Sequence, residues 1–145
     1  MLALIQRVSH ASVRVDGVVV GAIDAGLLAL VGVEPGDGDA QVRRMCERLL
    51  GYRVFGDDAG RMNRSLADVA GGLLLVSQFT LAADTSSGMR PGFQTAAAPD
   101  IAGPMFMRLV EACRASHAPV ATGKFGAHMR ITLENDGPVT FSLRT

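Results

Sequence analysis

The sequence contains few cysteines and histidines, and their positions argue against both a disulfide framework and a metal site. Cys46 and Cys113 fall on the apolar stripes of predicted helices, where small buried thiols are expected. The three histidines, His10, His117 and His128, show no metal-ligand spacing with one another or with either cysteine. We therefore expect reduced thiols in the core, no bound metal and no other cofactor.

The chain also lacks net charge. It carries 14 basic and 14 acidic residues, and Lys124 is its only lysine. Proteins that bind a long stretch of nucleic acid usually have a basic surface patch and an elevated pI. We therefore expect no DNA partner, and any contact with RNA should be small.

Long hydrophobic runs are missing as well. The longest, Gly26–Val33 and Leu73–Val76, are far shorter than the roughly 20 residues that span a bilayer. The start, Met1–Ile5, runs into Gln6 and Arg7 and lacks the features of a signal peptide. We therefore expect a cytoplasmic protein without a membrane partner. With 145 residues, 48% of them hydrophobic, and no shift in composition, the chain predicts one domain over residues 1–145.

Alternating or continuous apolar stretches predict a chain rich in β-strands, in which the Asp16-Gly17 dipeptide forms a hairpin turn. After Tyr52–Phe55, the segment Gly56–Gly60 is predicted to form a turn. The predicted strands are Leu2–Val8, Ser12–Val20, Gly26–Val33, Tyr52–Phe55, Leu73–Leu81, Met129–Leu133 and Val139–Leu143.

Two segments have helical periodicity instead. The first is predicted to run from an N-cap at Asp39 to Gly51, and the second covers Met105–His117. Pro104 suits a first helical turn, so the second helix is expected to begin near Gly103. Ala82–Ala98 reads as a long irregular connection, of the kind that is usually functional or disordered. Strands with two helices that each bury one face predict an α/β fold of layered, mixed β-sheets.

The segment Ser77–Leu81 closes a buried strand with two hydroxyls and an amide. Within a strand, Gln78 and Thr80 would share one face and Ser77 the other, so both hydroxyls could not point together. Taken alone, the segment is most simply a strand end whose hydroxyls bond to nearby backbone. A nucleophilic hydroxyl also needs a base, and no histidine lies nearby in the sequence. The pattern therefore favours a site that positions a substrate over one that attacks it.

A second candidate segment is Asn135–Thr140, in which Gly137-Pro138 bends the chain between two alternating strands. Gly-Pro between strands is usually only a turn, and cis X-Pro bonds are uncommon, at about 5–6% of X-Pro bonds in folded proteins. The dipeptide alone is thus a weak functional signal.

Five spaced segments together are more specific, and in this order they closely resemble the D-aminoacyl-tRNA deacylase family from end to end. They are Gln6–Val8, Ser77–Asp84, Met89–Pro91 before Phe93, Thr122–Ala127 before Met129, and Asn135–Thr140. Gly92 and Gly103-Pro104 depart from the family pattern outside these segments, which affects only the expected loop and helix-start geometry.

The resemblance implies a homodimer with both helices on one side of the sheets, acting on the acceptor end of aminoacyl-tRNA. It implies that Gly137-Pro138 is a cis dipeptide that enters the neighbouring subunit's pocket and excludes L side chains, with Arg7 holding it in orientation. Ser77, Gln78, Phe79 and Thr80 would surround the ester as the catalytic set. Phe125, Gly126, Ala127 and Met129 would bind the terminal adenosine of tRNA.

An aminoacyl ester is already activated, so a water positioned by the terminal 2′-OH of tRNA, with donors for the oxyanion, can suffice without a triad. A steric wall cannot reject glycine, so glycyl-tRNA is an expected substrate too. Two alternatives stay open, namely a covalent esterase or peptidase that uses Thr80, and a non-catalytic module that binds RNA ends.

The remaining polar residues have simpler interpretations. His128 is expected on the polar face opposite Met129, and His10 and His117 at the surface or satisfied in the core. The roles of Lys124 and Arg90 stay open at this stage.

Overall fold

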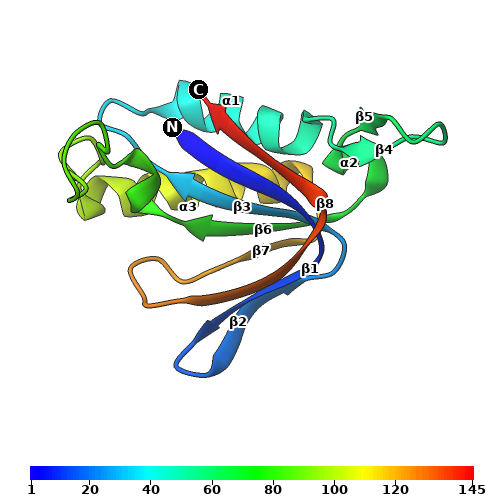
Figure 1. The fold of residues 1–145 in the computed structure, drawn as a ribbon, viewed down its shortest axis with the longest axis horizontal. Helices are drawn as coiled ribbons and strands as arrows, with labels where there is room; N and C mark the ends of the chain where they lie inside the picture. The colour runs from blue at the N-terminus through cyan, green and yellow to red at the C-terminus, as the bar shows by residue number, and fades with distance from the viewer.

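The computed structural model describes residues 1–145 and shows a six-stranded sheet that bends back over itself, with the helices on one face (Figure 1). Its main strand order is β2-β1-β3-β6-β7, and β8 pairs with the other edge of β1. Parallel and antiparallel pairs are both present, so the predicted mixed α/β architecture is confirmed.

Strand β1 runs without a break from Leu2 to Val15 and pairs with three other strands of the sheet. Its first half pairs with β3 (Gly26–Gly32) and its second half with β2 (Val18–Ile23), both antiparallel. The sequence predicted two strands here, but a single strand bends and changes neighbours. The predicted turn is confirmed, because Asp16 and Gly17 both have positive φ, of 50° and 82°, as a two-residue hairpin turn requires.

Strand β8 spans Arg130–Arg144 and pairs antiparallel with β1 along almost its whole length. It replaces the two C-terminal strands that were predicted. The register of the pairing shifts twice, between Gln6 and Val8 and between Val8 and His10, and the larger shift places Thr140 opposite Gln6 and Asn135 opposite Val8. The segment between them, which contains Gly137-Pro138, has no partner in the pairing and bulges out opposite Arg7.

The other side of β3 carries the parallel strands β6 (Gly72–Ser77) and β7 (Val120–Thr122). The prediction of one strand through Leu81 is wrong, because β6 ends at Ser77 and a 3₁₀ helix, η1 (Phe79–Ala82), follows. Strand β7 was not predicted, since three residues are too few to show a period.

Helices α1 (Asp39–Gly51) and α3 (Pro99–Ser116) cover one face of the sheet. The N-cap of α1 is Gly38, one residue before the predicted cap, and its backbone N–H donates to Gln41 Oε1 at 3.0 Å. The predicted start of α3 near Gly103 is also wrong. Pro99 takes the first-turn position, and Pro104 lies inside the helix, where the missing Cβ of Gly103 removes one of the clashes that a proline ring makes.

A small projection separates α1 from β6. It was predicted as one short strand over Tyr52–Phe55 and a turn, but only Phe55 of that range is in a strand. Strand β5 and helix α2, which begins after a Ser65 cap bonded to Asp68, were not predicted. The elements are β4 (Phe55–Gly56), β5 (Met62–Arg64) and α2 (Leu66–Val69).

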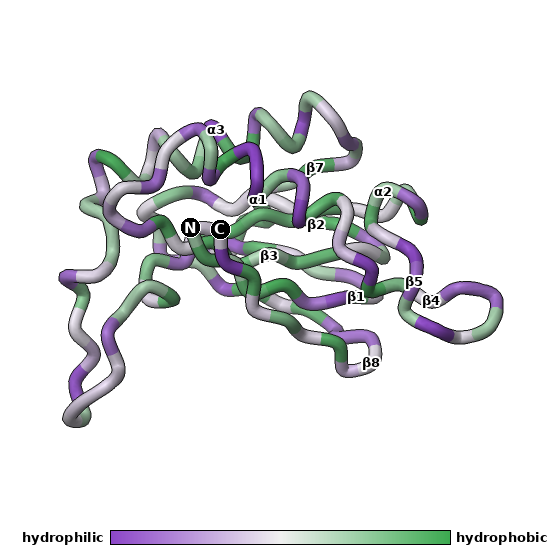
Figure 2. Tube along the Cα trace, turned by 90° about the horizontal axis from the view of Figure 1, so that it is seen from above, coloured by the Kyte–Doolittle hydropathy of each residue, from purple (hydrophilic) through white to green (hydrophobic).

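Two apolar layers hold these elements together, and the hydrophobic stretches concentrate in the sheet (Figure 2). The larger layer lies between the sheet and helices α1 and α3, and the smaller lies inside the curled half of the sheet. Cys46 and Cys113 are both buried, as predicted, and neither forms a disulfide. Contact with Cys46 and burial raise the pKa of the Cys113 thiol far above its ordinary value. None of the helices has the length and apolar composition needed to cross a membrane.

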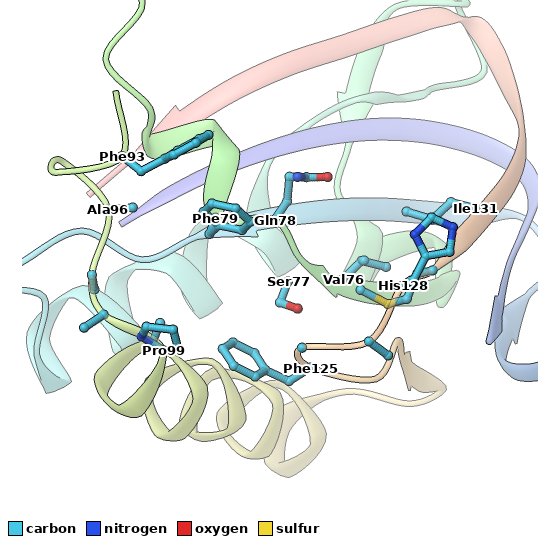
Figure 3. A pocket seen from close by; sticks show the side chains of 16 residues that line it. Val76, Ser77, Gln78, Phe79, Phe93, Ala96, Pro99, Phe125, His128 and Ile131 are labelled. Carbon is cyan, nitrogen blue, oxygen red and sulfur yellow. The ribbon is translucent and has the colours of Figure 1, made fainter. Parts of the chain in front are cut away.

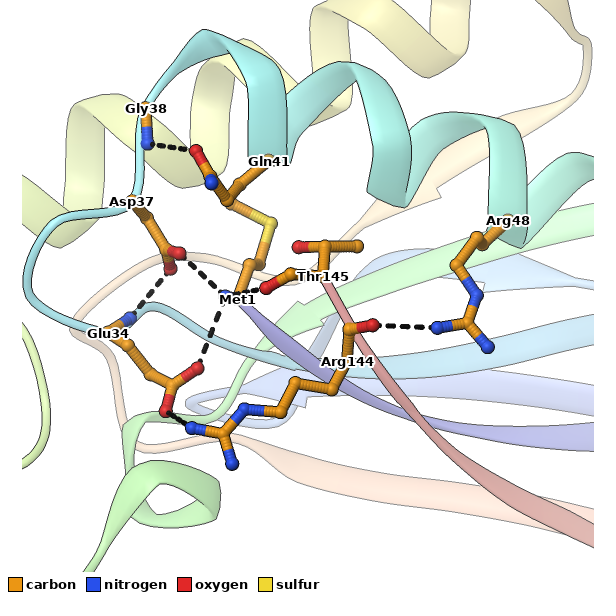
Figure 4. A network of polar contacts seen from close by, with 8 residues as sticks. All are labelled: Met1, Glu34, Asp37, Gly38, Gln41, Arg48, Arg144 and Thr145. Carbon is orange, nitrogen blue, oxygen red and sulfur yellow. Dashed lines mark hydrogen bonds and ion pairs between the residues drawn. The ribbon is translucent and has the colours of Figure 1, made fainter.

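The turn that leads into α1 is tied to both chain ends (Figure 4). The amino group of Met1 donates to Asp37 Oδ1 at 2.6 Å and to Glu34 Oε2 at 3.2 Å, and Arg144 donates to Glu34 Oε1 at 2.5 Å. Just before this turn, the carbonyl of Val33 accepts the N–H of Ala97 at 2.9 Å. The network therefore supports the segment that forms one wall of the cavity described next.

Candidate active site

The candidate site begins where β6 leaves the sheet. The N–H of Gln78 still donates to the carbonyl of Val31 at 2.7 Å, which extends the pairing with β3 by one residue. The chain then tightens into η1, so Phe79 and Thr80 no longer follow strand alternation. The first N–H groups of a helix have no partners within it, and here these belong to Phe79 and Thr80. In an unbroken strand, the Ser77 and Thr80 hydroxyls would lie on opposite faces. Because the strand ends before η1, this constraint no longer applies.

A cavity of about 680 Å³ opens beside this break (Figure 3). Its walls come from the end of β6, the segment before and at the start of α3, and the loop that joins β7 to β8. The Ser77 hydroxyl points into the space between Phe79 and Phe125 (Figure 3). Small-molecule sites typically enclose about 300–1,000 Å³ within mostly apolar walls, and this cavity fits that description.

Thr80 lies on η1 next to the cavity, although it is not one of the lining residues. Its hydroxyl accepts a hydrogen bond from the Gln78 side-chain amide at 2.5 Å. Gln78, Ser77 and Phe79 do line the cavity. The four residues of the predicted catalytic set are therefore brought together on one side.

The opposite side of the cavity is formed by the β7–β8 loop, and all four residues predicted to bind adenosine line it: Phe125, Gly126, Ala127 and Met129. Phe125 lies against Phe106 of α3, with ring centroids 6.3 Å apart.

Two glycines keep the β7–β8 side of the cavity in shape. A Cβ at Gly103 would lie 3.2 Å from the Phe125 ring, and one at Gly123 would lie 2.6 Å from Met129 Sδ. Contacts this close could form only if the neighbour moved, so both glycines make room for the side chains that line the cavity.

Several lining residues were not foreseen from the sequence. Phe93 packs on Phe79 with ring centroids 5.2 Å apart, and the Ala96–Pro99 segment closes the cavity between them and α3. His128 also lines the cavity, which corrects the expectation that it lies on the polar face opposite Met129. The β7–β8 loop extends through Met129, so strand alternation does not apply to this residue. His117, by contrast, lies 2.7 Å from the Gly71 carbonyl, a satisfied position as expected.

The Gly137-Pro138 bend forms a separate, exposed feature. Its peptide bond is cis, and Gly137 has a φ of +145°, a conformation that favours glycine. Arg7 braces it: Nε donates to the Asp136 carbonyl at 2.9 Å and lies 3.2 Å from the Asp136 carboxylate, while Nη1 donates to the Val54 carbonyl at 2.6 Å. On the other flank, the Val139 N–H donates to Asn135 Oδ1 at 2.8 Å. The bend is thus held from both sides.

The bend does not reach the cavity of its own chain. It lies opposite Arg7, which is level with Leu27 of β3 and Leu73 of β6. Ser77 is four residues farther along β6, and three strand spacings separate β8 from β6, so bend and Ser77 lie roughly 20 Å apart. Within one chain, the two predicted functional segments stay apart.

The electrostatics of the cavity are simple. No carboxylate, ammonium or guanidinium group lines it, and His128 is its only titratable lining residue. One hydroxyl, from Ser77, one amide, from Gln78, and several aromatic rings suit the binding of an uncharged, partly aromatic group. Fold and cavity thus define an α/β protein with a mostly apolar pocket whose few polar groups carry no formal charge.

Comparison with known proteins identifies the family. Residues 4–144 match the family model described as D-Tyr-tRNA(Tyr) deacylase, so the chain belongs to this hydrolase family. A D-aminoacyl-tRNA deacylase of Xanthomonas axonopodis pv. citri (strain 306) is 72% identical over 145 residues, with 99% of each chain covered. The protein of the same name from Stenotrophomonas maltophilia (strain K279a) is 70% identical, also with 99% of each chain covered.

Two solved structures share the fold over nearly the whole chain. One, described as a c-Myc DNA unwinding element binding protein, has a TM-score of 0.95 at 36% identity and covers 100% of this chain and 99% of its own. The other, described as a probable eukaryotic D-amino acid tRNA deacylase, has a TM-score of 0.79 at 16% identity, with 98% of each chain covered.

Proposed function

We propose that this protein hydrolyses the ester bond of D-aminoacyl-tRNA and releases free tRNA and the D-amino acid. The observation that carries the proposal is the meeting of Ser77–Thr80 and Phe125–Met129 around one cavity of about 680 Å³. Family membership and the names of the relatives support the same activity.

The β7–β8 side of the cavity receives the terminal adenosine of tRNA. Unpaired bases are read by stacking on aromatic rings, and Phe125 offers a ring backed by Phe106. Gly126 and Ala127 leave space beside it, and Met129 contributes an adaptable apolar contact. The absence of charged groups from the walls fits the binding of an uncharged base and ribose.

The ester then lies on the β6 side, between Ser77 and η1. The backbone N–H groups of Phe79 and Thr80 stabilise the developing oxyanion, and the Gln78–Thr80 hydrogen bond fixes the Thr80 hydroxyl. The terminal 2′-OH of tRNA positions the attacking water. No hydrogen bond joins His128 to Ser77 or Thr80, which favours this route over a side-chain nucleophile with a histidine base.

Chirality is selected by a second copy of the chain. The Gly137-Pro138 bend is exposed, held by Arg7 and roughly 20 Å from the cavity of its own chain, so it serves a cavity only in a homodimer. Inserted into the neighbouring cavity, its carbonyl groups form a wall where an L side chain would lie. Rejection by a wall is steric and requires no particular D side chain.

Two other functions remain in competition. In the first, Thr80 forms a covalent acyl intermediate, as in an esterase or peptidase. In the second, the cavity binds RNA ends without turnover. Each predicts a result that the deacylase proposal does not.

Incubation with matched D- and L-alanyl-tRNA, while release of the amino acid is followed, tests the proposal. We expect release from the D substrate and negligible release from the L substrate. Glycyl-tRNA should be hydrolysed too, because glycine has no side chain to meet the wall. Binding of the tRNA end without release from any substrate would support the binding module, and an adduct trapped on Thr80 would support the covalent enzyme.

A further inference from the structure

The outer face of the β1–β8 pair carries two arginines directly opposite each other. Arg14 pairs with Arg130, and the next pair along the same face is Ser12 with Thr132. Both arginines are exposed, and neither takes part in any of the ion pairs of the structure. Like charges directly opposite each other destabilise a strand pair, so stability does not explain this arrangement.

The arginine pair adjoins the β8 side of the cavity through the sequence neighbours of Arg130. Arg130 is flanked in sequence by Met129 and Ile131, which both line the cavity, while its own side chain alternates to the outer face. Beyond β8 there is no further strand, because β8 pairs only with β1. An RNA strand that leaves the cavity over this edge would therefore reach the arginines within one or two nucleotides.

The donors on this face suit phosphate. A guanidinium group binds phosphate oxygens through paired, charge-assisted hydrogen bonds, and serine and threonine hydroxyls are common additional donors. The acidic residue paired along the same row, Glu134, lies farther from the arginines and accepts a hydrogen bond from Ser9 Oγ at 2.7 Å. Asp16, two residues after Arg14, belongs to the hairpin turn that follows β1. The cavity end of the row is thus positive and rich in donors.

We propose that Arg14 and Arg130, assisted by Ser12 and Thr132, bind the phosphodiester backbone of the tRNA acceptor strand just outside the cavity. This inference rests on the proposed function, because it takes the terminal nucleoside to occupy the cavity. The patch contacts one or two phosphates, which is compatible with a chain of zero net charge.

The test compares the unmodified protein with an Arg14→Gln/Arg130→Gln double variant on two substrates. One is D-alanyl-tRNA, and the other is the D-alanyl ester of adenosine, which has no phosphate. On the tRNA substrate we expect KM to rise about tenfold with kcat unchanged, as expected for lost charge-assisted hydrogen bonds. On the adenosine ester, both constants should stay the same. An Arg14→Lys/Arg130→Lys variant keeps the charge and should recover part of the loss.

Binding of uncharged tRNA provides a readout that does not depend on catalysis. The double variant should bind more weakly, and its plot of log affinity against log salt should be shallower by about 0.7 for each lost phosphate contact. The matched control is Arg43→Gln/Arg114→Gln, which removes the same charge from exposed positions on α1 and α3. The control should change neither binding nor KM.

Removing the opposed charges should also slightly raise the midpoint of thermal unfolding, whereas a structural role would lower it. Equal losses on both substrates, an unchanged salt slope, or an equal loss in the Arg43 and Arg114 control would overturn the proposal. Failure of the proposed function would look different. The unmodified protein would then hydrolyse neither substrate, while the binding comparison would still decide whether the arginines contact RNA.

Discussion

The cavity and the Gly137-Pro138 bend differ in how complete they are within one chain. The cavity collects residues from β6, η1, the start of α3 and the β7–β8 loop, and its walls close around a defined space. The bend is also braced, by Arg7 and Asn135, yet it is exposed and contributes no residue to the cavity of its own chain. The cavity is formed within one chain, whereas the bend is an ordered, exposed segment without a binding site of its own chain beside it.

This difference shows that local order alone does not define a site. Two hydrogen bonds, from Arg7 to the Asp136 carbonyl and from the Val139 N–H to Asn135, hold the exposed bend, and a third fixes Arg7 itself to the Val54 carbonyl. Such bracing is useful when the held groups must meet something outside the chain in a fixed position. The changes below disturb one region or the other, and we order them from the largest expected effect to the smallest.

The largest effect is expected at Gly137. With a φ of +145° and a Cβ that would lie 2.8 Å from the Val139 nitrogen, Gly137→Ala must displace the bend. In the proposed dimer the bend lies inside the neighbouring cavity beside the ester, so displacing it also misplaces the D substrate. A misplacement of about 1 Å can cost about 100-fold in rate, and we expect that loss in hydrolysis of D-alanyl-tRNA. Gly17→Ala is the control, because Gly17 also has a positive φ but no neighbour within 4 Å. Equal activities of the two variants would show that the bend has no catalytic role.

Next comes Thr80, on the cavity side. Thr80→Ala removes a hydroxyl held by Gln78 and should slow hydrolysis by roughly 1–3 kcal/mol of activation free energy, the cost of one lost hydrogen bond. Thr85→Ala, in the exposed loop, serves as the control. Complete loss of turnover with normal folding and tRNA-end binding would instead indicate covalent catalysis. A tRNA ending in 2′-deoxyadenosine should be a poor substrate for the unmodified protein.

Phe125 tests the binding half of the cavity. Phe125→Ala should weaken binding of the tRNA end by about 1–3 kcal/mol, because one stacking surface is lost. Phe125→Leu keeps an apolar contact with Phe106 but has no aromatic face, so it should recover folding stability without recovering affinity. If leucine restored full affinity, the ring would serve packing and not recognition.

The smallest effect is expected at His128. Because no hydrogen bond joins it to Ser77 or Thr80, His128→Gln should change kcat/KM by less than about threefold, whereas loss of a general base costs about 10²–10⁴-fold. Steady-state kinetics on D-alanyl-tRNA provide the measurement. A loss in the larger range would assign the proton transfer to this imidazole.

Much of the fold could be predicted because its strands and helices are regular enough to show a period. β3, α1 and the Asp16-Gly17 hairpin match their patterns closely. The predictions failed where tertiary structure overrides local pattern. The strand expected through Leu81 ends at Ser77, next to the cavity, and α3 continues through Pro104, where the missing Cβ of Gly103 removes one of the clashes of the proline ring.

The site shows the same division. The predicted residues of the β6 end and the β7–β8 loop do gather around one cavity, since both segments follow neighbouring parallel strands. Phe93, Ala97 and His128 were missed. Phe93 and Ala97 lie in the long connection before α3 and His128 lies in the β7–β8 loop, and such irregular segments show no hydrophobic period from which a side-chain direction could be predicted. The separation of the bend from the cavity depends on strand order, which no local motif encodes.

Mixed dimers provide the decisive test of whether the two regions act between copies. One chain carries Gly137→Ala, and the other carries Gly123→Val, which would drive a side chain into Met129 and block the cavity. Each variant alone should hydrolyse D-alanyl-tRNA poorly. Random mixing after unfolding and refolding should restore about a quarter of normal activity, because half the dimers then contain one intact cavity served by an intact bend. Activity no higher than the average of the two separate variants would show that bend and cavity do not meet across a dimer.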